Sequence, residues 1–492
     1  MTDSNPLPLQ RDTPESESPR IVEQQLSLDD TIERCIGDGG WIQFFQATFI
    51  SFAYFFDAQQ CFVSIFTDAK PTWHCTSPSN SSCKNLCRIP RDSWNWDLPA
   101  HTSVISEWSL ECSGSIITGL MASSFFLGCL TGLFILASLA DSSLGRKNVL
   151  VLSCLLMSTS GVLTSFSTNV WMYTALRFIS GFGRSIIVTC TLVLSTELVG
   201  KKWRGRVGTI GFIGFALGFL SLPGLAYMTR GSSWRRIYQW TCIPAIFYSI
   251  LLYFIAYESP RWFYIKGQKE GALSGKTNCK KQIFYSAIKI LFQTSWALWR
   301  LAPVMAVGFG AGMINIGMPS GLDNLAFDLY LSVALNAFIE IPASFLSLYL
   351  IGNVSRKFSI LGSTILSGIC SATCVLVRWK GMQIGLELVS FFCGVVAMNL
   401  VLIYTLELFP TCVRNSSVSM VRQAMMLGGV CGPLLVAAGR KNRLLSYGVF
   451  GITIAVCGLF VVFLPETRGR TLCDTMDEEE RKNGSINNGV DT

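Results

Sequence analysis

Charged residues are scarce in this sequence. Asp, Glu, Lys and Arg make up only 14% of the 492 residues, whereas half of the chain is hydrophobic. Because soluble domains usually carry about 25% charged residues, this composition excludes an ordinary soluble protein. The mean hydropathy of +0.44 agrees. We therefore expect an all-α protein that crosses a membrane many times.

Histidine is equally scarce, with only His74 and His101 in the chain. No Cys/His cluster has metal-ligand spacing and no nucleophile elbow occurs, so we expect neither a metal site nor an enzyme. Residues 195–202 vaguely resemble a phosphate-binding loop, through Ser195, Gly200 and Lys201. A genuine loop begins with Gly and ends in Ser or Thr after a strand, so nucleotide binding is not expected. The net charge of +8 does not indicate nucleic acid either.

Apolar runs of the right length are abundant, since a bilayer core needs about 20 apolar residues per helix. Twelve candidate spans cover 41–66, 115–139, 149–167, 170–196, 207–228, 237–257, 299–318, 327–351, 358–377, 383–406, 417–438 and 445–464. If both tails lie on the inner side of these twelve spans, the inner segments carry about twice as many Lys and Arg residues as the outer loops. This bias favours a cytoplasmic amino terminus. The first 40 residues are polar and lack the apolar stretch of a cleavable signal peptide.

These spans predict two six-helix halves. The expected divisions are a disordered cytoplasmic tail (1–40), a first half (41–257) with an outer loop (68–114), a cytoplasmic connection (258–298), a second half (299–464) and a cytoplasmic tail (465–492). Within the connection, Ile283 to Phe292 has the composition of a helix that lies on the membrane surface.

The outer loop concentrates cysteines, although most of the 18 cysteines of the chain lie in apolar spans. Cys75, Cys83, Cys87 and Cys112 predict two disulfides, and the sequence leaves all three pairings open. Asn80 heads a glycosylation sequon in the same loop.

Charged residues at the inner ends of the spans occur twice, about 210 residues apart, as in an internally duplicated transporter. Glu197 and Arg204 recur as Glu407 and Arg414, and Arg146-Lys147 recurs as Arg356-Lys357. We expect these charges to latch the halves together on the cytoplasmic side when the central cavity faces outward. The alternative is that they only anchor helix ends in the interface.

Several motifs carry a family resemblance. The segment with Asp141, Gly145, Arg146 and Lys147 is similar to the loop signature of the major facilitator superfamily. Residues 258–262, 407–415 and 465–469, with Trp73-His74-Cys75 in a long outer loop, look like the organic cation/carnitine transporter family, especially its plant members. This resemblance implies secondary active transport of organic cations or carnitine-like zwitterions by alternating access, with a proton or sodium ion as the coupling ion. A sugar porter or organic-anion porter, and a receptor that senses such a solute without transporting it, are the alternatives.

Ionised residues inside the spans are the candidates for substrate contact, because intramembrane charge is costly and normally faces a cavity or a partner. The candidate substrate-binding residues are Asp57, Tyr54, Arg177, Arg184, Glu340, Arg422 and Tyr404. A structural pair of Asp57 with Arg177 is the alternative for those two residues. Animal relatives carry an acidic residue where Met426 stands here, which favours a zwitterion or an anion over a simple cation.

The solute and the lipid bilayer are the expected partners, in a plasma or vacuolar membrane. The sequence leaves the oligomeric state undetermined.

Overall fold

The computed structural model describes residues 41–76, 86–88, 90–140, 144–199, 201–259, 284–322, 328–439 and 443–467, with Met476, Glu480 and Arg481. In this part of the chain, twelve helical segments are long and apolar enough to cross a membrane. The predicted all-α membrane fold is thereby confirmed. Most predicted boundaries agree within a few residues, although the seventh span begins at Ser295 rather than 299.

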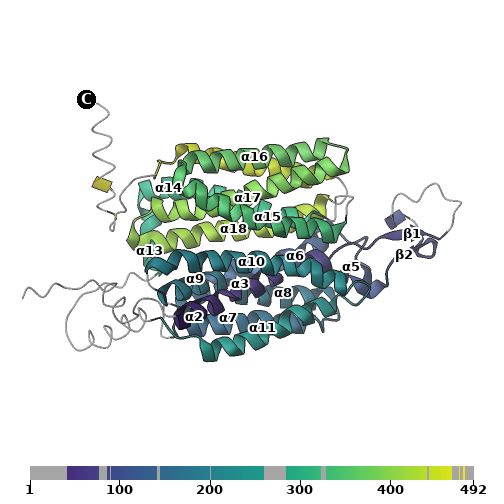
Figure 1. Cartoon of the computed structure of the whole chain (residues 1–492). Coiled ribbons are helices and arrows are strands. Elements are labelled where there is room, and N and C mark those ends of the chain that lie inside the picture. The colour runs from purple at the N-terminus through teal and green to yellow at the C-terminus, as the bar shows by residue number, and fades with distance from the viewer. Residues whose placement is uncertain are drawn as a thin grey trace, which may run out of the picture.

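The first six spans form the lower half of Figure 1. Span one consists of α2 (Trp41–Ser51), α3 (Ala53–Phe62) and α4 (Ser64–Thr67), and span four consists of α8 (Val170–Arg184) and α9 (Ile187–Glu197). The other four are α6 (Ser115–Ala140), α7 (Arg146–Thr164), α10 (Lys201–Met228) and α11 (Arg235–Ile255). Gly145, which precedes α7, has a φ of 82°, a backbone conformation that glycine adopts without strain.

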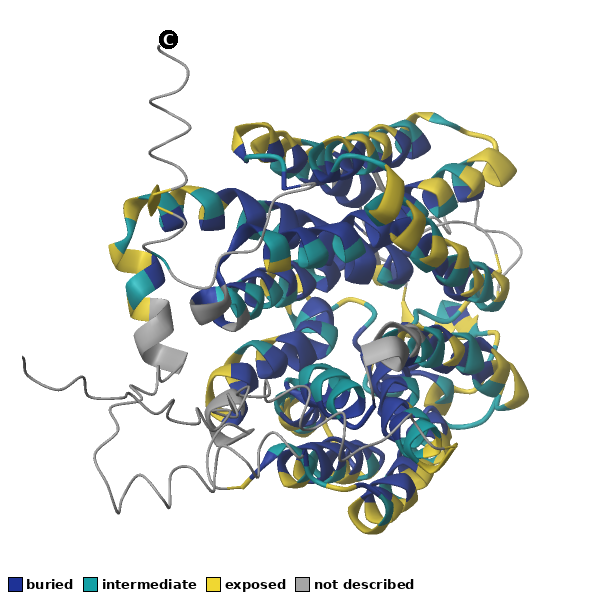
Figure 2. Ribbon diagram, turned by 60° about the vertical axis from the view of Figure 1, so that its left-hand side comes forward, coloured by how far each residue is buried: buried dark blue, intermediate teal, exposed yellow. Residues whose placement is uncertain are grey.

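The second half lies above the first in Figure 1. It contains α14 (Ser295–Ser320), α15 (Leu329–Asn353), α16 (Arg356–Leu376), α17 (Lys380–Leu408), α18 (Thr411–Gly439) and α19 (Arg443–Leu459), followed by the 3-10 turn η5 (Phe460–Phe463). The short helix α13 (Phe284–Gln293) precedes α14, where the sequence predicts a surface helix. Exposed residues cover the outward-facing sides of both halves, as expected for helices that contact lipid (Figure 2).

The outer loop is a small structured unit at the opposite end of the molecule from α13 (Figure 1). Strands β1 (Trp73–Cys75) and β2 (Trp94–Trp96) pair antiparallel, with Trp73 opposite Trp96. Around them lie the 3-10 turns η1 (Leu86–Arg88), η2 (Arg91–Ser93) and η3 (Ala100–Thr102) and the helix α5 (Val104–Glu107). A disulfide joins Cys87 to Cys112, and Cys75 is also disulfide-bonded.

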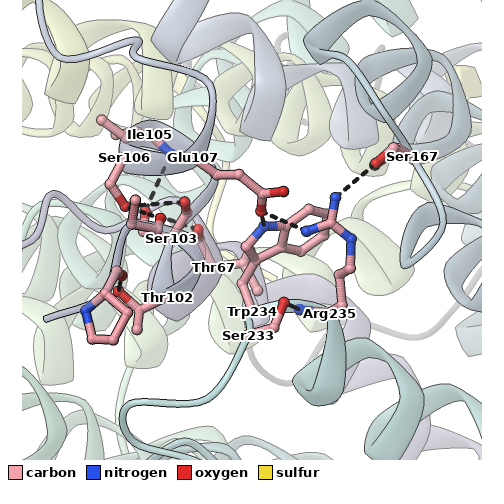
Figure 3. A network of polar contacts seen from close by, with 12 residues as sticks. Thr67, Thr102, Ser103, Ile105, Ser106, Glu107, Ser167, Ser233, Trp234 and Arg235 are labelled. Atoms are coloured by element: carbon pink, nitrogen blue, oxygen red, sulfur yellow. Dashed lines mark hydrogen bonds and ion pairs between the residues drawn. The ribbon is translucent and has the colours of Figure 1, made fainter.

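This outer loop is fastened to the first half (Figure 3). The Glu107 carboxylate accepts hydrogen bonds from Trp234 Nε1, at 2.6 Å, and from the Arg235 guanidinium. Arg235 also donates to the carbonyl of Ser167 at 3.0 Å, and Ser103 Oγ donates to the carbonyl of Thr67 at 3.2 Å. The loop therefore belongs structurally to the first half.

The two halves touch from the centre of the bundle to its outer end. Ser123 Oγ on α6 donates to the carbonyl of Val430 on α18 at 2.7 Å. Tyr330, at the outer start of α15, lies against Phe66 and Tyr227 of the first half, with ring centroids 5.6 and 5.8 Å away. A cavity of about 40 Å³ remains between the outer ends, lined by Ser64, Asp68 and neighbouring residues. This volume holds a few waters and is too small for an organic solute.

Candidate functional site

A buried ion pair lies at the centre of the first half. Asp57 on α3 is fully buried and accepts two hydrogen bonds from Arg184 on α8, Nε to Oδ1 and Nη2 to Oδ2, both at 2.9 Å. The two parallel bonds use both carboxylate oxygens. Arg184 therefore takes the place that the sequence alternative gave to Arg177. In this conformation the Asp57 carboxylate neutralises a protein cation.

Arg177 lies two helical turns from Arg184 and is 1% exposed. Its guanidinium carbon is 4.3 Å from the ring centroid of Phe125, and Nη1 donates to the carbonyl of Gln60 at 3.2 Å. Its Nε and Nη2 have no hydrogen-bond partner among the described residues. A side chain at Gly181, between the two arginines, would overlap the carbonyl of Phe125, so glycine lets α6 and α8 pack closely there.

Arg422 connects the halves at the level of this pair. Its Nη1 on α18 donates to Thr189 Oγ1 on α9 at 2.7 Å. Asp57, Arg184 and Tyr54 are close enough to interact with Arg422 electrostatically. The described residues offer Arg422 no carboxylate within salt-bridge distance, since Asp57 pairs with Arg184. Arg422 is thus the charge at the interface of the halves that a negatively charged group can still neutralise.

Tyr54 is nearby but does not face an open cavity. It is 4% exposed, and its hydroxyl donates to the carbonyl of Val188 on α9 at 3.1 Å. Gly211 on α10 lies against its ring. This position makes Tyr54 a support for the broken span four and leaves its role in substrate contact a prediction.

Two other candidates lie apart from this group. Glu340, on α15 of the second half, is 8% exposed, and its Oε2 has no hydrogen-bond partner among the described residues. No charged side chain of the described part acts on it electrostatically, and its role in substrate contact stays a prediction. Tyr404 lies at the inner end of α17, where its hydroxyl donates to the carbonyl of Pro465. Tyr404 is therefore not part of the central group.

The inner ends of the first half are tied by a network around α7. Arg146 bonds Glu197 at the end of α9. Glu258 accepts from the backbone N–H groups of Arg146 and Lys147, at 3.1 and 3.0 Å, where the α7 dipole is positive. Ser259 Oγ donates to Glu197. Glu258 thus binds the backbone at the start of α7, and Glu197 binds the side chain of Arg146.

The second half repeats this network. Arg356 bonds Glu407 through Nε and Nη2, at 3.2 and 3.1 Å. Glu466 accepts from the backbone N–H groups of Arg356 and Lys357, and Thr467 Oγ1 donates to Glu407 at 2.7 Å. The described contacts of each network join segments of one half, and they use both carboxylates of each copy. The latch between the halves that the sequence suggests for the outward-facing state stays a prediction.

Arg414 and Ser195 have local partners. Arg414 Nε donates to the carbonyl of Phe409 at 3.3 Å rather than to Glu407. Ser195 lies in α9, and its hydroxyl donates to the carbonyl of Leu192. A helix rather than a strand thus precedes the segment that resembles a phosphate loop.

Six predicted residues fall outside what the structure describes. They are Asn80, Cys83, Asp141 and Gly200, together with the side chains of Lys201 and Arg204. Their roles in glycosylation, disulfide bonding, the inner gate and the nucleotide-like segment stay predictions.

Sequence reasoning missed several partners of these charges. Phe125 faces Arg177, Thr189 faces Arg422, and Asn336 on α15 donates to Glu387 on α17 at 3.2 Å. Asp68 was also missed, although it lies three helical turns after Asp57, a spacing that repeats a helix face. It accepts a 2.7 Å hydrogen bond from Tyr173, which in turn contacts Tyr238.

Two halves of six spanning helices, with buried charges near their centre and repeated charged networks at their inner ends, define a secondary transporter of the major facilitator type. Solved transporters share this fold. The D-xylose-proton symporter superimposes with a TM-score of 0.61 at 17% identity, over 87% of this chain and 98% of that chain. The inward-open xylose transporter XylE from E. coli gives a TM-score of 0.62 at 17% identity, over 87% and 97%.

Sequence comparison defines the family. Residues 40–289 match the family described as "Sugar (and other) transporter". The chain is 54% identical over 486 residues to Organic cation/carnitine transporter 3 of Arabidopsis thaliana, which covers 93% of this chain and 94% of the relative. Organic cation/carnitine transporter 2 of the same plant is 51% identical, over 98% and 96%. The mouse Solute carrier family 22 member 21 is 30% identical, over 79% and 74%.

The chain belongs to the organic cation/carnitine transporter family. It is therefore an integral, multi-pass membrane protein that transports a solute, and not an enzyme.

Proposed function

We propose that this protein carries a carnitine-like zwitterion by alternating access, driven by a proton or sodium gradient. The carboxylate of the solute binds Arg422, and its quaternary ammonium group binds on the side of Glu340. Relatives named organic cation/carnitine transporters support the solute class.

The charge of Arg422 is the observation on which the proposal rests. Asp57 is the acidic group that interacts with Arg422 electrostatically, and Arg184 occupies both of its oxygens. Because Asp57 and Arg184 neutralise each other, Arg422 leaves the region beside this pair positively charged. A bare organic cation would be repelled there, whereas a carboxylate would form charge-assisted hydrogen bonds.

Glu340 gives the second end of the proposed site. Its carboxylate is buried in the second half, with one oxygen unpartnered in the described structure. A quaternary ammonium group donates no hydrogen bond, so a carboxylate binds it through charge alone. A zwitterion satisfies both ends at once, which neither choline nor a simple anion does.

Transport in proteoliposomes tests this assignment. Radiolabelled carnitine uptake should be inhibited by excess carnitine more strongly than by choline, acetate or glucose. Preferential inhibition by glucose would favour a sugar porter, and preferential inhibition by acetate an anion porter. Saturable binding without accumulation inside the vesicles would favour a solute-sensing receptor.

The membrane is part of the proposal as well. Formation of the Cys87–Cys112 disulfide requires an oxidising compartment, which suits an outer loop in the extracellular space or the vacuolar lumen. A fluorescent fusion expressed in plant cells, imaged against plasma-membrane and vacuolar markers, distinguishes these locations.

A further inference from the structure

Glu387 is a buried acid that the proposed carnitine site does not use. It lies on α17, two helical turns from the outer end at Lys380, and is 0% exposed. No cation pairs with it in the described structure. Cys374 on α16 is the titratable group that interacts with Glu387 electrostatically. Glu340 on α15 does not interact with it. Among the described residues, α14 and α18 place no charged group against it.

Its hydrogen-bond partner is the amide of Asn336, which is also 0% exposed. Asn336 Nδ2 donates to the carbonyl of Ser332 at 3.1 Å and to Glu387 Oε2 at 3.2 Å. Both hydrogens of the amide nitrogen are thereby used. This fixes the orientation of the amide, since a flipped group would turn its oxygen toward two acceptors.

Two acceptor atoms of this same pair are left without a donor. They are Glu387 Oε1 and Asn336 Oδ1, both buried and without a hydrogen-bond partner in the described structure. An ionised carboxylate only accepts hydrogen bonds and satisfies neither atom. A single proton on Oε1 would turn that atom into a donor for the unpartnered amide oxygen. With that second bond, the pair would form two parallel hydrogen bonds, like an acid facing an amide.

We propose that Glu387 is the binding site of the coupling proton and that Asn336 is its positioning partner. Asn336 lies one helical turn before Glu340 on the same face of α15. Gain or loss of the proton at Glu387 makes or breaks the second hydrogen bond to Asn336, from Oε1 to the amide oxygen, and so acts on the helix that carries the proposed ammonium site. This inference rests on the proposed carnitine transport, of which it names the driving ion.

The Glu387→Gln variant tests the proposal, because its amide imitates the protonated acid at nearly the same size. In proteoliposomes, an imposed pH gradient should increase carnitine accumulation by the native protein. The variant should lose this increase, so that uptake with and without the gradient becomes equal. It should keep carnitine exchange between loaded vesicles and medium within about twofold, since exchange needs no net proton movement.

Ser390→Ala is the matched control. Ser390 lies one turn further along α17, is buried and bonds Ser367 across to α16, but it does not titrate. It should keep the response to the pH gradient. A Glu387→Gln protein that still accumulates carnitine in response to the gradient would overturn the proposal.

Infrared spectroscopy of the membrane-embedded protein decides the point without any transport assay. The native protein should show the carbonyl band of a protonated carboxylic acid that appears and disappears with pH, and Glu387→Gln should lack it. Asn336→Ala should displace both this band and its pH midpoint. A spectrum without such a band, or one that Glu387→Gln and Asn336→Ala leave unchanged, excludes the proton site. If carnitine is not the solute, the uptake experiments fail while the infrared result still stands.

Discussion

The inner ends of the two halves are alike, whereas their centres differ. Arg146 bonds Glu197 as Arg356 bonds Glu407. In each copy a second acidic residue, Glu258 or Glu466, accepts a hydrogen bond from the backbone N–H of that arginine at the start of its helix. With the same offset of 210 residues between the two halves, Arg184 corresponds to Gly394 and Arg177 corresponds to Glu387. The first half thus carries a charged pair where the second half has Asn315 donating to the Gly394 carbonyl at 3.2 Å.

This difference separates the residues that hold the frame of the protein from the residues that determine which solute and ion it binds. Duplication keeps the contacts that fix helix ends, because both halves need the same rigid frame to rock. The central positions are free to diverge, because the solute and the driving ion meet different residues in each half. In this protein the first half pairs Asp57 with Arg184, and the second half keeps Arg422, Glu340 and Glu387 without ionic partners in the described structure.

The strongest test of this division breaks the charged pair in the first half. Asp57→Asn leaves Arg184 as a buried cation without a counterion, which should cost about 3–5 kcal/mol of stability. The double variant Asp57→Asn/Arg184→Gln should recover much of the loss. The measurement is thermal unfolding of the purified protein in detergent. Equal stability of the native protein and Asp57→Asn would show that the pair is not structural.

Removal of the interface charge should affect transport rather than folding. Arg422→Gln should lower carnitine uptake about 10- to 100-fold, since a hydrogen bond to a charged group contributes about 1.5–3 kcal/mol. Choline uptake should not fall. Thr189→Val, which removes only the hydroxyl that Arg422 contacts, is the control and should cost less. A parallel loss of both solutes would argue against a carboxylate at this position.

The symmetry of the inner networks predicts matched, smaller effects. Glu197→Gln and Glu407→Gln should each lower stability by about 1 kcal/mol, because these partly exposed ion pairs contribute modestly. The two melting temperatures should differ little from each other. A much larger effect in one half would show that the copies have taken on different roles.

The outer loop, which only the first half carries, gives the smallest expected effect. Hydrogen bonds from Thr72 and His74 lower the pKa of Asp97. The carboxylate therefore stabilises the loop above the unfolded pKa of about 3.9, and this contribution disappears as the pH falls through the lower folded value. The difference in melting temperature between the native protein and Asp97→Asn should vanish with acidification. A difference that persists at the lowest pH would exclude this linkage.

The sequence predicted the helices and the motifs well, because both depend on local patterns. Long apolar runs mark the spans, and Arg146 and Arg356 stand out as rare charges at helix ends. Partners across helices could not be read in the same way. Arg177 and Arg184 share a helix face, so spacing alone did not show which of them reaches Asp57. Phe125 and Asn336 gave no signal, since an aromatic ring or an amide in a span is ordinary packing until a charge faces it.

The attachment of the outer loop has a practical consequence. Glu107, Trp234 and Arg235 hold the outer loop to the first half, so we expect the loop to follow that half through the transport cycle. A nanobody or spectroscopic label on the outer loop would report the tilt of this half without hindering it. A short crosslinker from the outer loop to the start of α15 would instead tether both halves and arrest the carrier.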